Sequence, residues 1–275
     1  MIIDSHQHFW SYHPERHAWI SEEMEILKRD YLPRDLEPVL KAQGVDGCVA
    51  VQAEMSEQET LFLLESARKH PFIKGVVGWV DLRMPDAGNR LEYFSAYPAL
   101  KGLRHIVQDE PDDQFMLRPD FQNGIGLLAR FGLTYDILIY PWQLPAALAL
   151  VRQFPGQQFV LDHLAKPRIS DGLDIKWQRQ IRELASHPNV FCKLSGMVTE
   201  TRDFQWTKEE FKPFMDTVLR AFGPERLLFG SDWPVCLLAA SYAEVAGIVR
   251  SYLQSLSETE QLGIMGGNAI RFYDL

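Results

Sequence analysis

The chain has 275 residues, of which 46% are hydrophobic and 24% are charged, and its formal net charge is −9. This balance is typical of a folded protein rather than a disordered one, and the negative charge argues against a nucleic-acid partner or an anionic membrane surface. No apolar run reaches the roughly 18 residues of a membrane span, and the first residues lack a signal-peptide pattern. Three scattered cysteines (Cys48, Cys192 and Cys236) predict reduced thiols in a cytoplasmic protein.

Short apolar segments alternate with longer amphipathic ones along the whole chain. Strands are predicted at residues 2–5, 47–53, 73–80, 100–106, 134–140, 158–163, 190–195 and 227–231. Helices are predicted from Pro33 to Gly44 and at residues 60–69, 121–131, 144–154, 175–187, 208–222 and 242–256.

Eight such units of about 34 residues predict an α/β fold, a (β/α)8 barrel forming one domain over residues 1–275. A doubly wound open sheet is the alternative, which the absence of a glycine-rich phosphate loop weakens. The least regular segments, residues 11–32 and 108–118, both follow predicted strands. We therefore expect them to form walls or lids over a site at the carboxyl ends of the strands.

The first candidate site lies near the N-terminus, where His6 and His8 are two residues apart. Side chains at this spacing in an extended strand point to the same side. Two imidazoles at the end of a strand can bind one divalent ion or hydrogen-bond to one oxygen. A surface turn would give the same pattern, so the motif alone leaves both interpretations open.

Two further candidates follow later strands. His163 comes after the apolar strand at 158–163, and Asp232 comes directly after the strand at 227–231. Taken singly, a histidine or aspartate at such a position is usually structural. In a closed barrel, however, the carboxyl ends of all strands share one mouth, and the first and last strands are neighbours. His6, His8, His163 and Asp232 are therefore predicted to converge there.

Five short motifs extend over nearly the whole chain: DSHQHFW at 4–10, DHLAKP at 162–167, KLSGM at 193–197, GSDWP at 230–234 and GNAIRFY at 267–273. In this order they resemble the amidohydrolase superfamily, in the amidohydrolase 2 branch that holds sugar lactonases of the L-fuconolactonase and L-rhamnonolactonase type. The resemblance implies a distorted (β/α)8 barrel that hydrolyses its substrate at a carbonyl. It also implies that His6, His8, His163 and Asp232 are the residues that the family uses for this chemistry.

The metal content implied by the resemblance is at most one divalent ion. Binuclear members of the wider superfamily carry a bridging lysine or glutamate after the fourth strand and a histidine after the fifth. Here Lys101 lies at the start of its strand, and the fifth strand offers no histidine. One ion, with Zn²⁺ favoured, would be held by His6, His8, His163 and Asp232, with Glu54 as an additional ligand. Some members of the branch hydrolyse lactones without an ion.

These residues predict the hydrolysis of a sugar-acid lactone, of the L-fucono or L-rhamnono type, to the aldonic acid. Asp232 would act as the general base for water, and the three histidines would polarise the carbonyl directly or through the ion. The predicted substrate-binding residues are Arg104, Lys166, His105, Gln52, Trp10 and Trp233.

Three alternatives remain open at this point. They are a metal-dependent decarboxylase, a dicarboxylate-lactone hydrolase and a non-catalytic binding barrel. The first two need cationic groups for a substrate carboxylate, and only Arg104 and Lys166 are candidates. The expected partner is a small-molecule sugar lactone, no nucleic acid or membrane partner is expected, and the sequence leaves open whether the protein forms a homo-oligomer.

Overall fold

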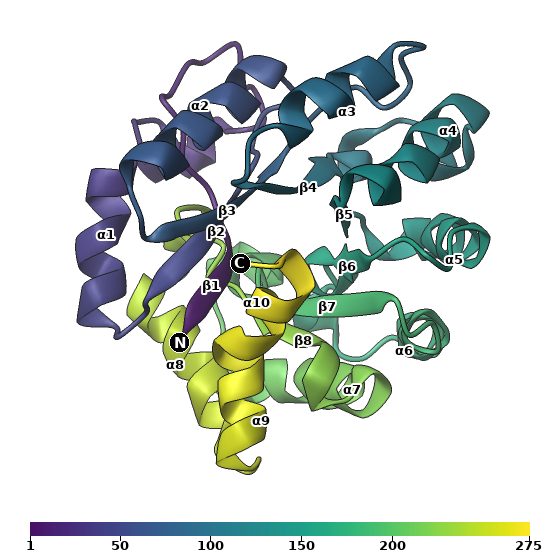
Figure 1. The fold of residues 1–275 in the computed structure, drawn as a ribbon. Coiled ribbons are helices and arrows are strands. Elements are labelled where there is room, and N and C mark those ends of the chain that lie inside the picture. The colour runs from purple at the N-terminus through teal and green to yellow at the C-terminus, as the bar shows by residue number, and fades with distance from the viewer.

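The computed structural model describes residues 1–275, which form a barrel of eight parallel strands in chain order with helices around it (Figure 1). The strands are β1 (Ile3–Gln7), β2 (Gly47–Val51), β3 (Ile73–Gly78), β4 (Leu100–His105), β5 (Thr134–Ile137), β6 (Phe159–Leu161), β7 (Val190–Leu194) and β8 (Leu227–Phe229). All eight predicted strands and the predicted barrel are confirmed, and each strand ends before the limit expected from the sequence except β1, which extends two residues further.

The helices follow the strands in the alternation that the sequence predicts. They are α1 (Pro33–Ala42), α2 (Glu57–Lys69), α3 (Ala87–Ser95), α4 (Pro119–Leu128), α5 (Leu144–Gln153), α6 (Ile175–Ala185), α7 (Lys208–Phe222), α8 (Tyr242–Leu253), α9 (Glu258–Leu262) and α10 (Asn268–Tyr273). Helix α3 was not predicted: it is short, and it contains the helix breaker Gly88 and only three buried residues.

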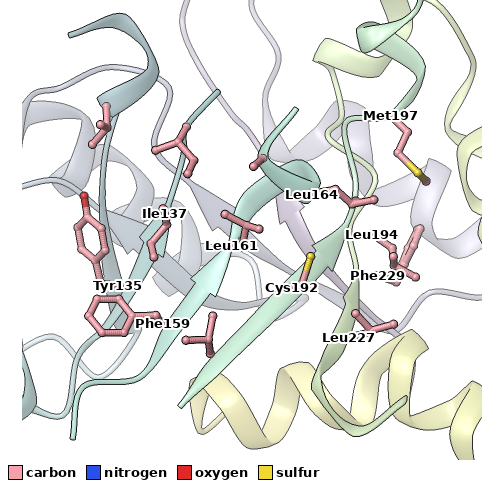
Figure 2. Packing of buried hydrophobic residues seen from close by; sticks show 14 of the residues in the cluster. Tyr135, Ile137, Phe159, Leu161, Leu164, Cys192, Leu194, Met197, Leu227 and Phe229 are labelled. Atoms are coloured by element: carbon pink, nitrogen blue, oxygen red, sulfur yellow. The ribbon is translucent and has the colours of Figure 1, made fainter. Parts of the chain in front are cut away.

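Side chains alternate between the two faces of the barrel strands. In β5 to β8, the residues that face the helices are apolar and include Tyr135, Phe159, Cys192 and Phe229 (Figure 2). The residues between them face the barrel interior. The interior is apolar near the amino ends of the strands and polar near their carboxyl ends. This alternation sends Asp136 and Lys193 inward, because each lies next to an outward-facing residue.

The barrel closes between β8 and β1. The Asp232 backbone N–H donates to the His6 carbonyl at 2.8 Å, and the His8 N–H donates to the Trp233 carbonyl at 2.7 Å. These bonds hold the residues after β8 directly against the end of β1. The closure thus fixes the backbone that carries three of the four predicted site residues.

Helix α10 crosses the opposite end of the barrel, where it covers the amino ends of the strands (Figure 1). Ala269, Phe272 and Tyr273 pack there against inward-facing residues such as Val160 and Phe191. The end of the barrel away from the strand carboxyl ends is therefore filled by side chains.

The three cysteines are buried and unpaired, as the sequence predicts. No helix is both long enough and apolar enough to cross a lipid bilayer.

Candidate active site

A cavity of about 400 Å³ lies at the carboxyl ends of the strands and is lined by His8, Arg104, His163 and Asp232 among others. Both irregular segments contribute to its wall. Trp19 and Met24 come from the segment 11–32, and Gln108 and Asp109 come from the segment 108–118. The expectation that these segments form walls over the site agrees with this lining.

The four predicted site residues meet at one carboxylate oxygen. Asp232 Oδ1 lies 3.3 Å from His8 Nε2, 3.9 Å from His6 Nε2 and 3.9 Å from His163 Nε2. None of these residues is more than 4% exposed. The structure therefore brings together side chains that are 226 positions apart in the sequence (232 − 6).

His6 and His8 reach this point because they are two residues apart at the end of β1. Their ring centroids lie 5.0 Å apart, with the rings nearly perpendicular. The pairing of β1 with β2 contains an irregularity between Asp4 and Gln7, where three steps along β1 match two steps along β2. This bulge re-aims the end of the strand, which is a common role of bulges beside active sites.

His163 arrives by a different route. It begins a run of four residues with positive φ, from His163 (φ 52°) to Lys166 (φ 48°). Such a run is costly for residues other than glycine, and it is typical of functional sites. The left-handed turn leaves Asp162 facing the barrel interior and brings the imidazole of His163 to the mouth, where Nδ1 lies 2.8 Å from Ser195 Oγ.

The donor set at the mouth fits a divalent cation. His8 Nδ1 lies 2.7 Å from the Val51 carbonyl, which can only accept, so Nδ1 carries the proton. In the neutral ring, Nε2 then presents a lone pair to Asp232 Oδ1. Two acceptors 3.3 Å apart need a cation or a proton between them. With His6 they form a compact group of nitrogen and oxygen donors that suits Zn²⁺.

The pKa shifts at the site favour an ionised Asp232 carboxylate beside neutral imidazoles of His6 and His163. Burial alone would raise the pKa of Asp232, but His163 and His8 outweigh it and hold the pKa below its ordinary value. Burial lowers the pKa of His163 to about 4 and that of His6 well below its ordinary value. At neutral pH, Asp232 is therefore ionised and can accept a proton.

Two cations reach the cavity wall, and both already have carboxylate partners. Arg104 Nη1 donates to Asp162 Oδ2 at 3.1 Å, and Nη2 donates to Gln52 Oε1 at 3.0 Å. Lys166 Nζ lies 3.5 Å from Glu200 Oε1 and 5.6 Å from the centre of the Tyr140 ring. Gln52 does not line the cavity and instead supports Arg104 from behind.

The remaining predicted residues lie outside the cavity wall. Glu54 lies 3.8 Å from Arg16 Nη1, lines a separate surface hollow and is not among the grouped donors that could hold an ion. Glu54 lies in the loop after β2 and not at the end of the strand, because β2 ends at Val51.

The predicted substrate-binding residues Trp10, Trp233 and His105 contact other side chains of the protein instead of the cavity. Trp10 packs edge-on against Tyr31, as does Trp233. His105 is bonded to Glu110 at 2.6 Å and stacks on Phe115. These side chains support the wall from behind and are not among the residues that line the cavity.

In the network behind the site, the structure adds three charged residues that sequence analysis missed or gave no role. Asp162 Oδ1 lies 3.3 Å from His6 Nδ1, and Lys193 Nζ lies 3.0 Å from the same nitrogen. Asp136 is paired with Lys193. The signal was present in the sequence, since Asp136 and Lys193 each interrupt an apolar strand, where an unpaired charge would be costly.

We expect Gly196→Ala to impair the site through His163. Gly196 has a φ of +65°, and an added Cβ would lie 2.6 Å from the His163 ring at Cγ. Displacement of the ring by even 1 Å should lower kcat by about 10²-fold. The matched control is Gly132→Ala, because Gly132 has a φ of +67° but open space around the added Cβ. Similar melting temperatures with a loss of kcat only in Gly196→Ala would support the role of His163, and equal kcat values would contradict it.

Acidification is expected to destabilise the fold through His163. The unfolded chain binds a proton near the ordinary pKa of 6.5, whereas the folded site binds it only near 4. Stability is therefore present at neutral pH and is lost as the pH falls below 6.5. Between pH 7.5 and pH 5 this group alone should remove about 2 kcal/mol. Urea unfolding of the wild type and His163→Gln at both pH values measures this, and an equal pH dependence in the two proteins would contradict it.

Comparisons with known proteins agree with the fold. The model of the amidohydrolase family matches residues 3–275. An L-fucono-1,5-lactonase of Burkholderia multivorans is 42% identical, over 99% of this chain and 96% of that protein. An L-fucono-1,5-lactonase of Burkholderia ambifaria is 36% identical, over 98% of this chain and 94% of that protein. The crystal structure of a Burkholderia multivorans amidohydrolase with bound zinc has a TM-score of 0.96 at 43% identity and covers 100% of this chain and 99% of that one.

Proposed function

Since this chain belongs to the amidohydrolase family, we propose that it hydrolyses the ring ester of a neutral sugar-acid lactone, of the L-fucono or L-rhamnono type, to the aldonic acid. The observation that carries the proposal is the convergence of three imidazoles on the carboxylate of Asp232, at a cavity of about 400 Å³ that His8, His163 and Asp232 line. The lactonase activity of full-length relatives supports the same reaction.

Asp232 is the general base. Its ionised carboxylate takes a proton from a water molecule as the water oxygen bonds to the lactone carbonyl carbon. The ring C–O bond then breaks, and the same proton passes to the departing alkoxide. The product is an open chain with one carboxylic acid and one new hydroxyl, so atoms and charge balance.

The imidazoles of His8 and His163 and the guanidinium of Arg104 line the cavity and would face the carbonyl oxygen, where negative charge develops. Arg104 presents guanidinium N–H groups, and its contacts with Asp162 and Gln52 fix their direction. A divalent ion, when bound, would add Lewis-acid polarisation of the carbonyl, and the grouped donors of His6, His8 and Asp232 would hold it. Lys166 and Glu200 lie in the same wall and are suited to bind sugar hydroxyls.

The charges in the cavity wall favour a neutral substrate over a carboxylate. Arg104 and Lys166 are the cations that line it, and each is already paired with an acidic residue. A decarboxylase or a dicarboxylate-lactone hydrolase needs free cations to bind its substrate. The paired state of both cations therefore supports the aldonolactone over these two alternatives.

A lactone panel tests this function. Aldono-1,4-lactones and aldono-1,5-lactones, a dicarboxylate lactone and an aromatic carboxylate are incubated with the purified protein, and acid release or decarboxylation is followed. We expect turnover of L-fucono- or L-rhamnono-type lactones and none of the other two classes. Parallel assays after chelation and after Zn²⁺ addition measure the contribution of an ion. Failure to open any sugar lactone, with and without Zn²⁺, would refute the proposal.

A further inference from the structure

A chain of buried polar contacts connects helix α10 to the site through the interior of the barrel. The Tyr273 hydroxyl lies 2.8 and 3.0 Å from the two carboxylate oxygens of Asp136. Asp136 is paired with Lys193, whose Nζ lies 3.0 Å from His6 Nδ1. All four residues are no more than 1% exposed. The chain thus runs from the sealed end of the barrel to one of the imidazoles at its mouth.

Lys193 lies at the centre of this chain, and its ammonium group has no access to water. Its three polar neighbours are Asp136, Asp162 at 3.0 Å and His6 Nδ1 at 3.0 Å. Asp136 and His6 are hydrogen-bonded to the ammonium, and Asp162 adds an ion pair, so three polar groups surround its three donors. A fully buried lysine is rare unless it is paired, because removing the charge from water is costly.

The barrel interior could be filled without this charge. Just below the network it is apolar, with Val160, Phe191 and Leu228 packed against α10. Well-packed apolar residues commonly replace buried ion pairs without loss of stability. A structural requirement alone therefore does not explain a lysine and two aspartates at this level, whereas the contact with His6 does.

We propose that Lys193 is a positioning residue for the reaction. It fixes the His6 imidazole at the Nδ1 edge, so that the Nε2 edge faces Arg104 Nη1 at 3.2 Å and Asp232 Oδ1 at 3.9 Å. Asp136 and Tyr273 in turn fix the ammonium group. The terminal turn of α10, at the far end of the barrel, thereby sets the orientation of an imidazole in the cluster around Asp232. The kinetic part of this inference rests on the proposed function, whereas the orientation of His6 is measurable without it.

Tyr273→Phe is the mildest test, because it removes one hydroxyl and keeps the ring packed. We expect kcat to fall about tenfold, as is typical when a supporting contact behind an active-site ligand is lost. KM should change little, because Tyr273 is remote from the cavity wall. The matched control is Tyr135→Phe, since the Tyr135 hydroxyl is also buried but has no hydrogen-bond partner. That variant should keep the wild-type kcat.

A spectroscopic measurement separates positioning from mere stability. The ring nitrogens of ¹⁵N-labelled histidine report tautomer and hydrogen bonding, and loss of one signal set in His6→Asn assigns those of His6. We expect the His6 signals to shift in Tyr273→Phe and further in Lys193→Met, but not in Tyr135→Phe. Unchanged His6 signals in Tyr273→Phe would overturn the inference, as would a wild-type kcat in that variant.

The two proposals fail in different ways. If the wild-type protein opens no lactone, the proposed function is wrong, and the ¹⁵N signals still decide whether Tyr273 and Lys193 orient His6. If the wild type is active but Tyr273→Phe behaves like Tyr135→Phe in both measurements, only the positioning inference is wrong. If Lys193→Met does not fold, the comparison of Tyr273→Phe with Tyr135→Phe decides alone.

Discussion

Replacing Asp232 with asparagine is expected to lower kcat by about 10²–10⁴-fold while leaving the fold intact. The substitution keeps the shape of the side chain but removes the charge that accepts the proton of water. Asparagine also tolerates the backbone at this position, where φ is 59°. We therefore expect a folded protein that binds the lactone but opens it very slowly.

The matched control for this prediction is Asp274→Asn. Asp274 has a φ of 51° and is exposed. It follows α10, at the end of the barrel opposite the cavity. It undergoes the same chemical change on a similar backbone, so it should retain wild-type turnover and melting temperature. An Asp232→Asn enzyme that keeps more than about a tenth of the wild-type kcat would rule out Asp232 as the general base.

Among the substitutions proposed for this protein, Arg104→Met should cause the largest loss of stability. We expect the free energy of unfolding to fall by about 3–5 kcal/mol. Arg104 is 4% exposed and donates to the side chain and backbone of Gln52 and to Asp162. Methionine fills much of the volume but donates nothing. Asp162 then loses one of its two cationic partners, and the Gln52 oxygens remain buried without a donor.

Chemical denaturation of Arg104→Met beside Arg130→Met measures this effect. Arg130 is exposed on the surface, and its substitution should change the free energy of unfolding by no more than about 0.5 kcal/mol. A loss below about 1 kcal/mol in Arg104→Met would mean that the buried charges rearrange to compensate. The role of Arg104 in holding the network at the cavity would then be excluded.

The fold was accessible from sequence because its signals are local and repeated. Continuous apolar runs predict buried parallel strands, and their number and spacing predict the barrel. Helix α3 was missed because its apolar stripe consists of little more than Leu91 and Phe94. The sealing of the barrel by α10 was also missed, since nothing in a six-residue helix indicates which end of a barrel it covers.

The convergence of His6, His8, His163 and Asp232 was predictable because strand ends in a closed barrel share one mouth. The supporting residues were harder to predict. Strand alternation would point Asp162 and His163 to opposite sides, but alternation ends where β6 ends and the left-handed turn at His163 begins. The network of Asp136, Lys193 and Tyr273 depends on contacts across the barrel, which no local pattern specifies.

The run of left-handed residues from His163 to Lys166 also bears on how this protein would respond to laboratory evolution. Each such residue costs on the order of 1–3 kcal/mol, which the rest of the molecule must offset. Selection for heat resistance alone should therefore favour glycine at Ala165, whose φ is 60° and whose side chain is only a methyl group. The same change would loosen the loop that aims His163, so variants with the highest melting temperatures should be among the slower catalysts.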